Sequence, residues 1–273
     1  MLLILLKSSI AALIFAIGMT ATADDITYLW RRPFLFLKSI IAMYVVMPVV
    51  AVMMGRAFDL PQQTELALVV LVICAGAPLL PRKLIKFGGD PAYVFRLIVT
   101  TSILAIVSVP VSLHLLAEVI SFDTTAITPS QVSRVILKTL LLPLGMGMLL
   151  RLVAPALAGR IGDPLMKIAG ISMAISSIAA LFVGFRLVFA VGLPTLIAFA
   201  AFTSVAILAG HLLGGPKPSD RTSLSIACTS RHIGLALLIA ANARGQQALV
   251  LAYLLASAVV SIPYVRLVSK SFD

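Results

Sequence analysis

Long apolar segments follow one another along this chain, and only short polar connections separate them. Of the 273 residues, 61% are hydrophobic and 11% are charged, and the mean hydropathy is +1.13. A helix needs about 20 apolar residues to cross a bilayer. The pattern therefore predicts an all-α polytopic membrane protein with about nine transmembrane helices. These are expected near residues 2–22, 34–55, 65–80, 92–118, 132–152, 165–190, 193–213, 222–243 and 247–268.

Basic residues predict the orientation of these helices. The chain carries 21 Lys and Arg against 10 Asp and Glu. The basic residues are scattered between apolar segments, so nucleic-acid binding is not indicated. Alternate connections differ about twofold in Lys and Arg content, and the positive-inside rule places the richer side in the cytoplasm. We expect the amino terminus outside and the carboxyl terminus in the cytoplasm, in a bacterial inner membrane.

The first apolar segment ends in Ala21-Thr22-Ala23, which resembles a signal-peptidase site. Its leading residues MLLILL are apolar instead of basic, and the following DDITYLWRRP is typical of a loop that leads into the next span. We therefore expect this segment to be retained as a transmembrane helix. Cleavage after Ala23 is the alternative.

The segment 222–243 contains a cation near the middle of an apolar span, at Arg231, with His232 beside it. An arginine at the bilayer centre costs about 2.5–3.5 kcal/mol on insertion scales, so a functional role is indicated. The small polar run 228–230 before it and Gly234 after it predict a helix that loosens here. A broken helix is tolerated at membrane depth only where it faces protein or a wet cavity.

A second interrupted segment occurs in the first half of the chain. The span 65–80 ends in CAGAPLLPRKLIKFGGD, where Pro78 and Pro81 prevent a regular helix and Gly76 adds backbone freedom. Paired discontinuous segments in two halves of a chain are typical of inverted-repeat transporters with a binding site near the midplane.

Three stretches resemble the bile acid:sodium symporter superfamily: GMTATADDITYLWRRP after the first span, CAGAP with GGD at 74–90, and DRTSLSIACTSRHIGLALLIAA at 220–241. The resemblance implies two crossed discontinuous helices in a core that packs against a panel and works by alternating access. We expect the core to contain spans 34–118 and 193–268 and the panel spans 2–22 and 132–190, in a single unit 1–273.

The chain departs from the family at the positions that hold sodium. Ala227 stands where the family pattern has glutamate, His232 where it has asparagine, and Leu80-Pro81 where it has a Ser-Asn pair. A hard cation needs several oxygen ligands, and Arg231 would repel a neighbouring Na⁺. We therefore expect the family's sodium coupling to be lost, and we expect neither a cofactor nor a resident metal.

The interpretation that these features favour is a secondary transporter of a small organic anion that works by alternating access. The alternative is a membrane receptor or assembly protein that shares the fold but does not transport. An enzyme is not indicated, because no nucleophile-base pair, metal-ligand cluster or nucleotide-binding loop is present. The expected partners are the solute and the lipid bilayer, with no nucleic acid and no obligate protein partner.

The candidate residues fall into two sets. For Arg231, binding of a substrate anion and packing against helix-end carbonyls are both open; for His232, a structural hydrogen bond is favoured over proton transfer. The hydroxyls of the run 100–102 either line the cavity or satisfy carbonyls of their own helix. The candidates for substrate binding are Arg231, His232, Thr229, Ser230, Gly76 and Pro78, and those for an ion or cavity lining are Thr100, Thr101, Ser102 and Cys228.

Overall fold

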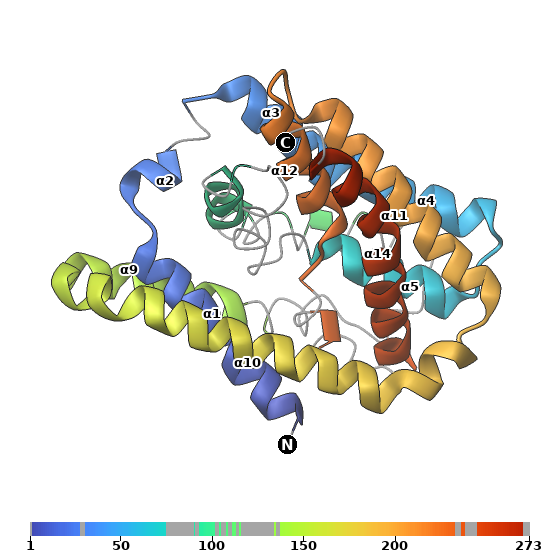
Figure 1. Ribbon diagram of the computed structural model, residues 1–273, viewed down its shortest axis with the longest axis horizontal. Coiled ribbons are helices and arrows are strands. Elements are labelled where there is room, and N and C mark those ends of the chain that lie inside the picture. The colour runs from blue at the N-terminus through green and yellow to red at the C-terminus, as the bar shows by residue number, and fades with distance from the viewer. Residues whose placement is uncertain are drawn as a thin grey trace.

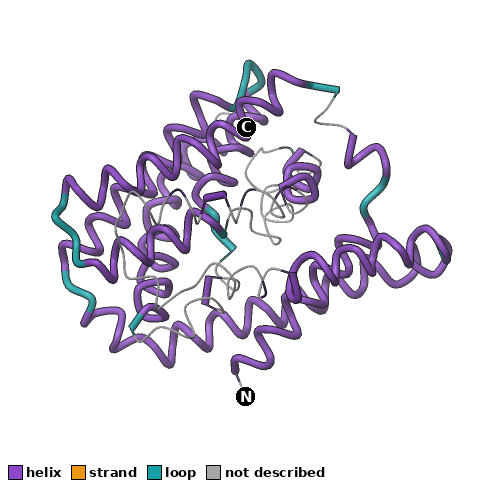
Figure 2. Tube along the Cα trace, turned by 180° about the vertical axis from the view of Figure 1, so that it is seen from behind, coloured by secondary structure: helices purple, strands orange, loops and turns teal. Residues whose placement is uncertain are grey.

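Helices make up all the regular structure in the described part of the computed structural model (Figure 2). This part consists of residues 2–27, 31–74, 90, 93–101, 104, 108, 111–112, 115, 134, 137–232, 236–237 and 245–269.

Three of the described helices are long and apolar enough to cross a membrane: Pro33–Ala57, Leu193–Leu213 and Gln246–Val268. Two shorter apolar helices cover Ile4–Thr20 and Gln62–Ile73. The membrane protein that the composition predicts is therefore confirmed. The count of nine spans stays a prediction, because several expected spans lie partly outside the described residues.

The first group of helices consists of α1 (Leu2–Thr20), α9 (Leu142–Val153) and α10 (Pro155–Ala190). In Figure 1 they run together along one side of the molecule, and α1 contacts both of the others. We call these three helices the α1 group.

Glycines bring α1 and α9 together at close range. A Cβ atom on Gly18 would meet the Leu144 carbonyl, and one on Gly147 would meet the Phe15 carbonyl. Small residues let membrane helices approach until their backbones touch, which gains dispersion contacts that lipid chains do not supply.

The helix α10 is longer than the sequence predicts. It runs without interruption over 36 residues from Pro155, and Pro164 lies inside it. The prediction that this span begins near residue 165 was wrong, because the Gly-, Asp- and Pro-containing stretch before it continues the helix by about 15 Å. Proline fits the first turn at Pro155, where no intrahelical N–H bond is lost.

The second group surrounds α11 (Leu193–Leu213) and consists of α4 (Met47–Ala57), α5 (Gln62–Ile73), α12 (Pro218–Thr229) and α14 (Gln246–Ser269). Figure 1 shows these helices together on the side opposite α1, and we call them the α11 group. The helix α11 contacts α12, α14 and α4, and α10 reaches across from the first group to contact α14.

Close glycine contacts recur between α11 and α12. A Cβ atom on Gly210 would meet the backbone of Ser225, and one on Gly214 would meet the backbone of Arg221. The four-residue spacing of the two glycines is that of the small-xxx-small interfaces of membrane helices. The helix α12 is therefore fixed against α11 before it reaches its break.

Two helices contain a π-helical turn next to a proline. The turn η1 (Ala42–Val46) joins α3 (Pro33–Ile41) to α4 and precedes Pro48. The turn η3 (Leu137–Leu141) leads into α9 just before Pro143. Because proline has no N–H to donate, the wider turn lets both helices continue past the proline.

The short helix α2 (Ala23–Thr27) is joined by an ion pair to a helical stretch farther along the chain. Arg96 Nε, on a helical stretch at 93–101, donates to Asp25 Oδ1 at 2.9 Å. The Thr22 hydroxyl donates to Asp25 Oδ2 at 2.6 Å. Burial acts to raise the pKa of Asp25, but the hydrogen bonds from Thr22 and Arg96 outweigh it, and the pKa lies below its ordinary value.

Candidate functional site

The helix α12 stops in the middle of its apolar segment. It ends at Thr229, and Ser230 has extended backbone angles, φ −84° and ψ 101°. The freed Thr229 carbonyl accepts a hydrogen bond of 2.6 Å from the Tyr253 hydroxyl on α14. The predicted loosening of the helix before Arg231 is confirmed, and a neighbouring helix satisfies the backbone at the break, as a membrane interior requires.

The helix α5 ends at the same place. Its last residue is Ile73, and Cys74 after it has left the helical conformation, with φ −80° and ψ 53°. The Cys74 carbonyl accepts a hydrogen bond of 2.8 Å from the backbone N–H of His232. The carboxyl-terminal ends of α5 and α12 are therefore linked directly, although they are far apart in the sequence.

Arg231 lies at this junction and is almost completely buried, with 2% of its surface exposed. Its guanidinium carbon is 5.9 Å from the centre of the Phe202 ring on α11. The guanidinium also lies near the thiols of Cys74 and Cys228. Aromatic and sulfur-containing side chains therefore form much of its described surroundings.

No nitrogen of the Arg231 guanidinium has a hydrogen-bond partner among the described residues. The Tyr253 hydroxyl lies near it but does not meet the geometry of a hydrogen bond. The two ion pairs found in the described part of the chain join Arg31 to Asp24 and Arg96 to Asp25. A buried guanidinium whose donors are open is suited to bind an acceptor group, because an unmade bond to a buried charge is costly.

His232 is equally buried, with 2% of its surface exposed. Its backbone both donates to Cys74 and accepts from the Ala236 N–H at 2.9 Å. The main chain of His232 therefore holds the two broken segments together, and a structural role for its side chain stays a prediction.

The remaining candidate residues differ in burial, and some of them lie outside the described residues. Thr229 is buried and its hydroxyl donates to the Ile226 carbonyl at 3.0 Å, Ser230 is partly exposed, and Cys228 is fully buried. Gly76, Pro78 and Ser102 lie outside the described residues, as do Leu80 and Pro81.

Thr100 and Thr101 use their hydroxyls within their own helix. Thr100 donates to the Arg96 carbonyl at 2.8 Å, and Thr101 donates to the Ile98 carbonyl at 3.1 Å. Both side chains are buried. Of the two interpretations of this run, satisfying local carbonyls is the one observed for these two residues.

Comparison with known proteins shows the family to which this chain belongs. Residues 9–191 match the profile of the Sodium Bile acid symporter family. The chain belongs to this family. The match includes most of α1 and all of α5 and α10, whereas the Arg231 stretch lies beyond the matched residues.

Individual relatives are distant members of the same family. The chain is 28% identical over 149 residues to the probable sodium/metabolite cotransporter BASS3, chloroplastic, of Oryza sativa subsp. japonica, which covers 54% of this chain and 34% of the relative. It is 27% identical over 175 residues to the uncharacterized sodium-dependent transporter YocS of Bacillus subtilis (strain 168). This second match covers 62% of this chain and 52% of the relative. The matches thus span about half of these relatives or less.

Two aromatic residues of the site were missed in the sequence. Phe202 and Tyr253 are fully buried, and their rings meet edge to face with centroids 6.0 Å apart. A tyrosine in the middle of an apolar helix was the available signal, because a buried Tyr hydroxyl normally finds a partner. Its partner, the Thr229 carbonyl, depends on a helix break that only the fold brings within reach.

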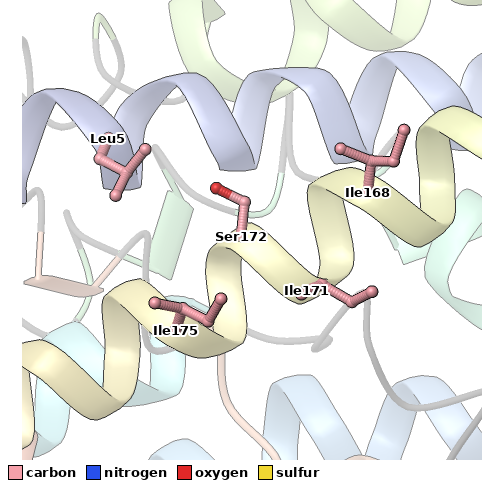
Figure 3. Close-up of a pocket in the computed structure, with 5 residues that line it drawn as sticks. All are labelled: Leu5, Ile168, Ile171, Ser172 and Ile175. Carbon is pink, nitrogen blue, oxygen red and sulfur yellow. The ribbon is translucent and has the colours of Figure 1, made fainter.

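A shallow apolar pocket on the α1 group is separate from this site. It has a volume of about 380 Å³ and is lined by Leu5, Ile168, Ile171, Ser172 and Ile175, which Figure 3 shows between α1 and α10. The Ser172 hydroxyl is hydrogen-bonded to that of Ser9 at 2.7 Å. With no charged group in its lining, the pocket offers no means of recognising an ion.

Proposed function

We propose that this family member is a secondary transporter of small organic anions and that the Arg231 guanidinium binds the anionic group. The observation that carries the proposal is a buried guanidinium with no hydrogen-bond partner among the described residues, placed where two membrane helices end. A planar guanidinium can hold a carboxylate or sulfonate by two parallel hydrogen bonds.

The packing of the helices supports alternating access between a core and a panel. The α1 group would be the panel and the α11 group the core, and the two broken helices would then lie in the core. Arginine in the membrane interior generally faces a bundle interior or a wet cavity, which is where a transported anion passes.

The proposed transport does not use sodium. The printed names of the relatives describe a sodium/metabolite cotransporter and a sodium-dependent transporter. In this chain the buried Ala227 offers no side-chain oxygen, and the hydroxyls of Thr100 and Thr101 are bonded to their own helix. Uptake into proteoliposomes should change little when Na⁺ is replaced by K⁺ or choline, and a collapse of uptake would reject this part of the proposal.

The role of Arg231 is tested by measuring solute affinity and thermal stability on the same purified variants. A panel of labelled carboxylates and sulfonates first identifies a transported anion. Arg231→Lys should then weaken binding severalfold, and Arg231→Gln should weaken it by about 10- to 150-fold, which corresponds to the 1.5–3 kcal/mol of a charge-assisted hydrogen bond.

Arg151→Gln is the matched control. Its guanidinium donates to the Met19 carbonyl at 2.8 Å and ties α9 to the end of α1, so its loss should reduce stability and leave affinity unchanged. Unchanged affinity and lowered stability in the Arg231 variants would show a structural role instead. Binding without flux for any anion would favour a receptor or assembly protein.

A further inference from the structure

The ends of α5 and α12 together create a negative electrostatic site in the membrane interior. The free carbonyls at the carboxyl end of a helix are equivalent to roughly half a negative elementary charge. Both helices have 12 residues, and the His232 to Cys74 hydrogen bond holds their ends together. The pair of ends thus supplies about one negative charge at a single place.

A side chain of the protein, the Arg231 guanidinium, supplies the positive charge at the ends of α5 and α12. The Arg231 guanidinium lies near Cys74, which directly follows α5, and near Cys228 in the last turn of α12. No carboxylate in the described part of the chain forms an ion pair with it. The two helix ends are therefore its main described source of negative potential.

Transporters use such a junction to hold an exchangeable cation, since the ends of half-helices and unwound carbonyls coordinate a coupling ion. We propose that the Arg231 guanidinium is a built-in cation, occupying a site that would otherwise take a small monovalent cation from solution. This inference rests on the proposed function. In addition to contacting the anion, the guanidinium then neutralises the negative partial charge at the ends of α5 and α12.

The surroundings select the kind of cation that could replace the side chain. The face of Phe202 lies under the guanidinium carbon, and the hydroxyl of Tyr253 is nearby. Aromatic faces favour weakly hydrated cations, and guanidinium is more weakly hydrated than an ammonium ion. Free methylguanidinium should therefore fill the site best, Na⁺ less well, and the bulkier choline least.

The experiment removes the side chain and returns its charged group from solution. Purified Arg231→Ala should unfold at a lower temperature than the parent. Low millimolar methylguanidinium should raise its unfolding temperature by about 5 °C, since a ligand that binds only the folded state stabilises it. Choline at the same ionic strength should have no effect, and no solute anion is needed.

Arg151→Ala controls for general effects of the guanidinium group. It also removes an arginine that contacts a helix-end carbonyl, but this arginine is partly exposed to solvent, whereas Arg231 is buried. Neither it nor the parent should gain stability from methylguanidinium. Equal stabilisation of both alanine variants would overturn the proposal.

Two further variants cover the case in which Arg231→Ala does not accumulate. Arg231→Gln should show the same cation response, whereas Arg231→Lys keeps a tethered charge and should accumulate without responding. A neutral variant that is as stable as the parent, or a lysine variant that does not accumulate, would overturn the proposal. Because these measurements use no anion, their failure would leave the proposed anion binding intact.

Discussion

The α1 group and the α11 group pack by the same means and differ in what they bury. In the first, a 36-residue helix runs unbroken, and the hydroxyls of Ser9 and Ser172 bond to each other. In the second, two helices end inside the protein, and a guanidinium lies at their ends with no hydrogen bond to the described residues.

This difference separates the group that only packs from the group that contains the proposed binding site. Both groups bring backbones into contact at glycines, so close packing by itself does not create a site. In the α11 group, by contrast, the ends of helices place backbone carbonyls and a cation in an apolar interior. There an unsatisfied polar group costs more free energy than at the surface, and electrostatic interactions between polar groups are stronger.

The largest effect should come from adding a single methyl group at the glycine contacts of either group. Gly147→Ala in the first group and Gly210→Ala in the second would each place a Cβ atom against the backbone of a neighbouring helix. We expect each to lower the free energy of unfolding by about 3 kcal/mol, the upper range for overpacking, because a backbone cannot move aside as a side chain can. Thermal unfolding of purified protein measures the loss.

Gly145→Ala is the control on the same helix as Gly147, because a Cβ atom there would meet nothing within 4 Å. It should be neutral or slightly stabilising, since alanine favours helix more than glycine. If Gly147→Ala behaved like this control, the close contact of α1 with α9 would be disproved.

An intermediate effect is expected at Tyr253, in the α11 group alone. Tyr253→Phe keeps the ring but leaves the buried Thr229 carbonyl without its donor. This should cost about 1–3 kcal/mol of stability. It should also weaken anion binding, because the break beside Arg231 loses its anchor. Thermal unfolding and solute affinity on one preparation measure the two effects.

Tyr264→Phe tests whether the effect is specific to the break. The Tyr264 hydroxyl donates to Ser225, whose own hydroxyl donates to the Ile207 carbonyl within the regular part of the bundle. We expect a smaller loss of stability, about 0.5–1.5 kcal/mol, and unchanged affinity. Equal losses of affinity in both variants would remove the distinction between the break and the rest of the group.

The smallest effect should come from the ion pair between α2 and the stretch 93–101, and it should depend on pH. The pKa of Asp25 is lower in the folded protein than its ordinary value of 3.8, since the bonds from Thr22 and Arg96 outweigh the effect of burial. The carboxylate therefore stabilises the fold above that value, and this stabilisation is lost as the pH falls through the folded pKa. Asp25→Asn should cost about 1 kcal/mol at neutral pH and less in acid.

Asp24→Asn is the matched control for Asp25. Its ion pair with Arg31 is exposed, with 77% of the Asp24 side chain and 72% of the Arg31 side chain accessible, so its loss should change stability little at any pH. A loss for Asp25→Asn that does not shrink in acid would show that the carboxylate charge is not the cause.

Three of the expected membrane spans could be predicted closely from the sequence. The expected spans at 34–55, 193–213 and 247–268 agree with the observed helices to within two residues at each end. Such agreement is possible because lipid forces each span to satisfy its own backbone, so apolar length alone determines where a helix lies. The break before Arg231 was also predicted, from a charge and small polar residues in one short stretch.

The partners at that break were decided by tertiary structure. Nothing in the local sequence places the His232 N–H on the Cys74 carbonyl, or the Tyr253 hydroxyl on the Thr229 carbonyl. Likewise, the Gly-, Asp- and Pro-containing stretch before position 165 is typical of a turn, and only the structure shows that α10 continues through it. Apolar length and a buried charge are properties of one segment and can be read along the chain. Whether a freed carbonyl, a guanidinium or a glycine finds a partner depends on which distant helix packs against it, and therefore on the fold.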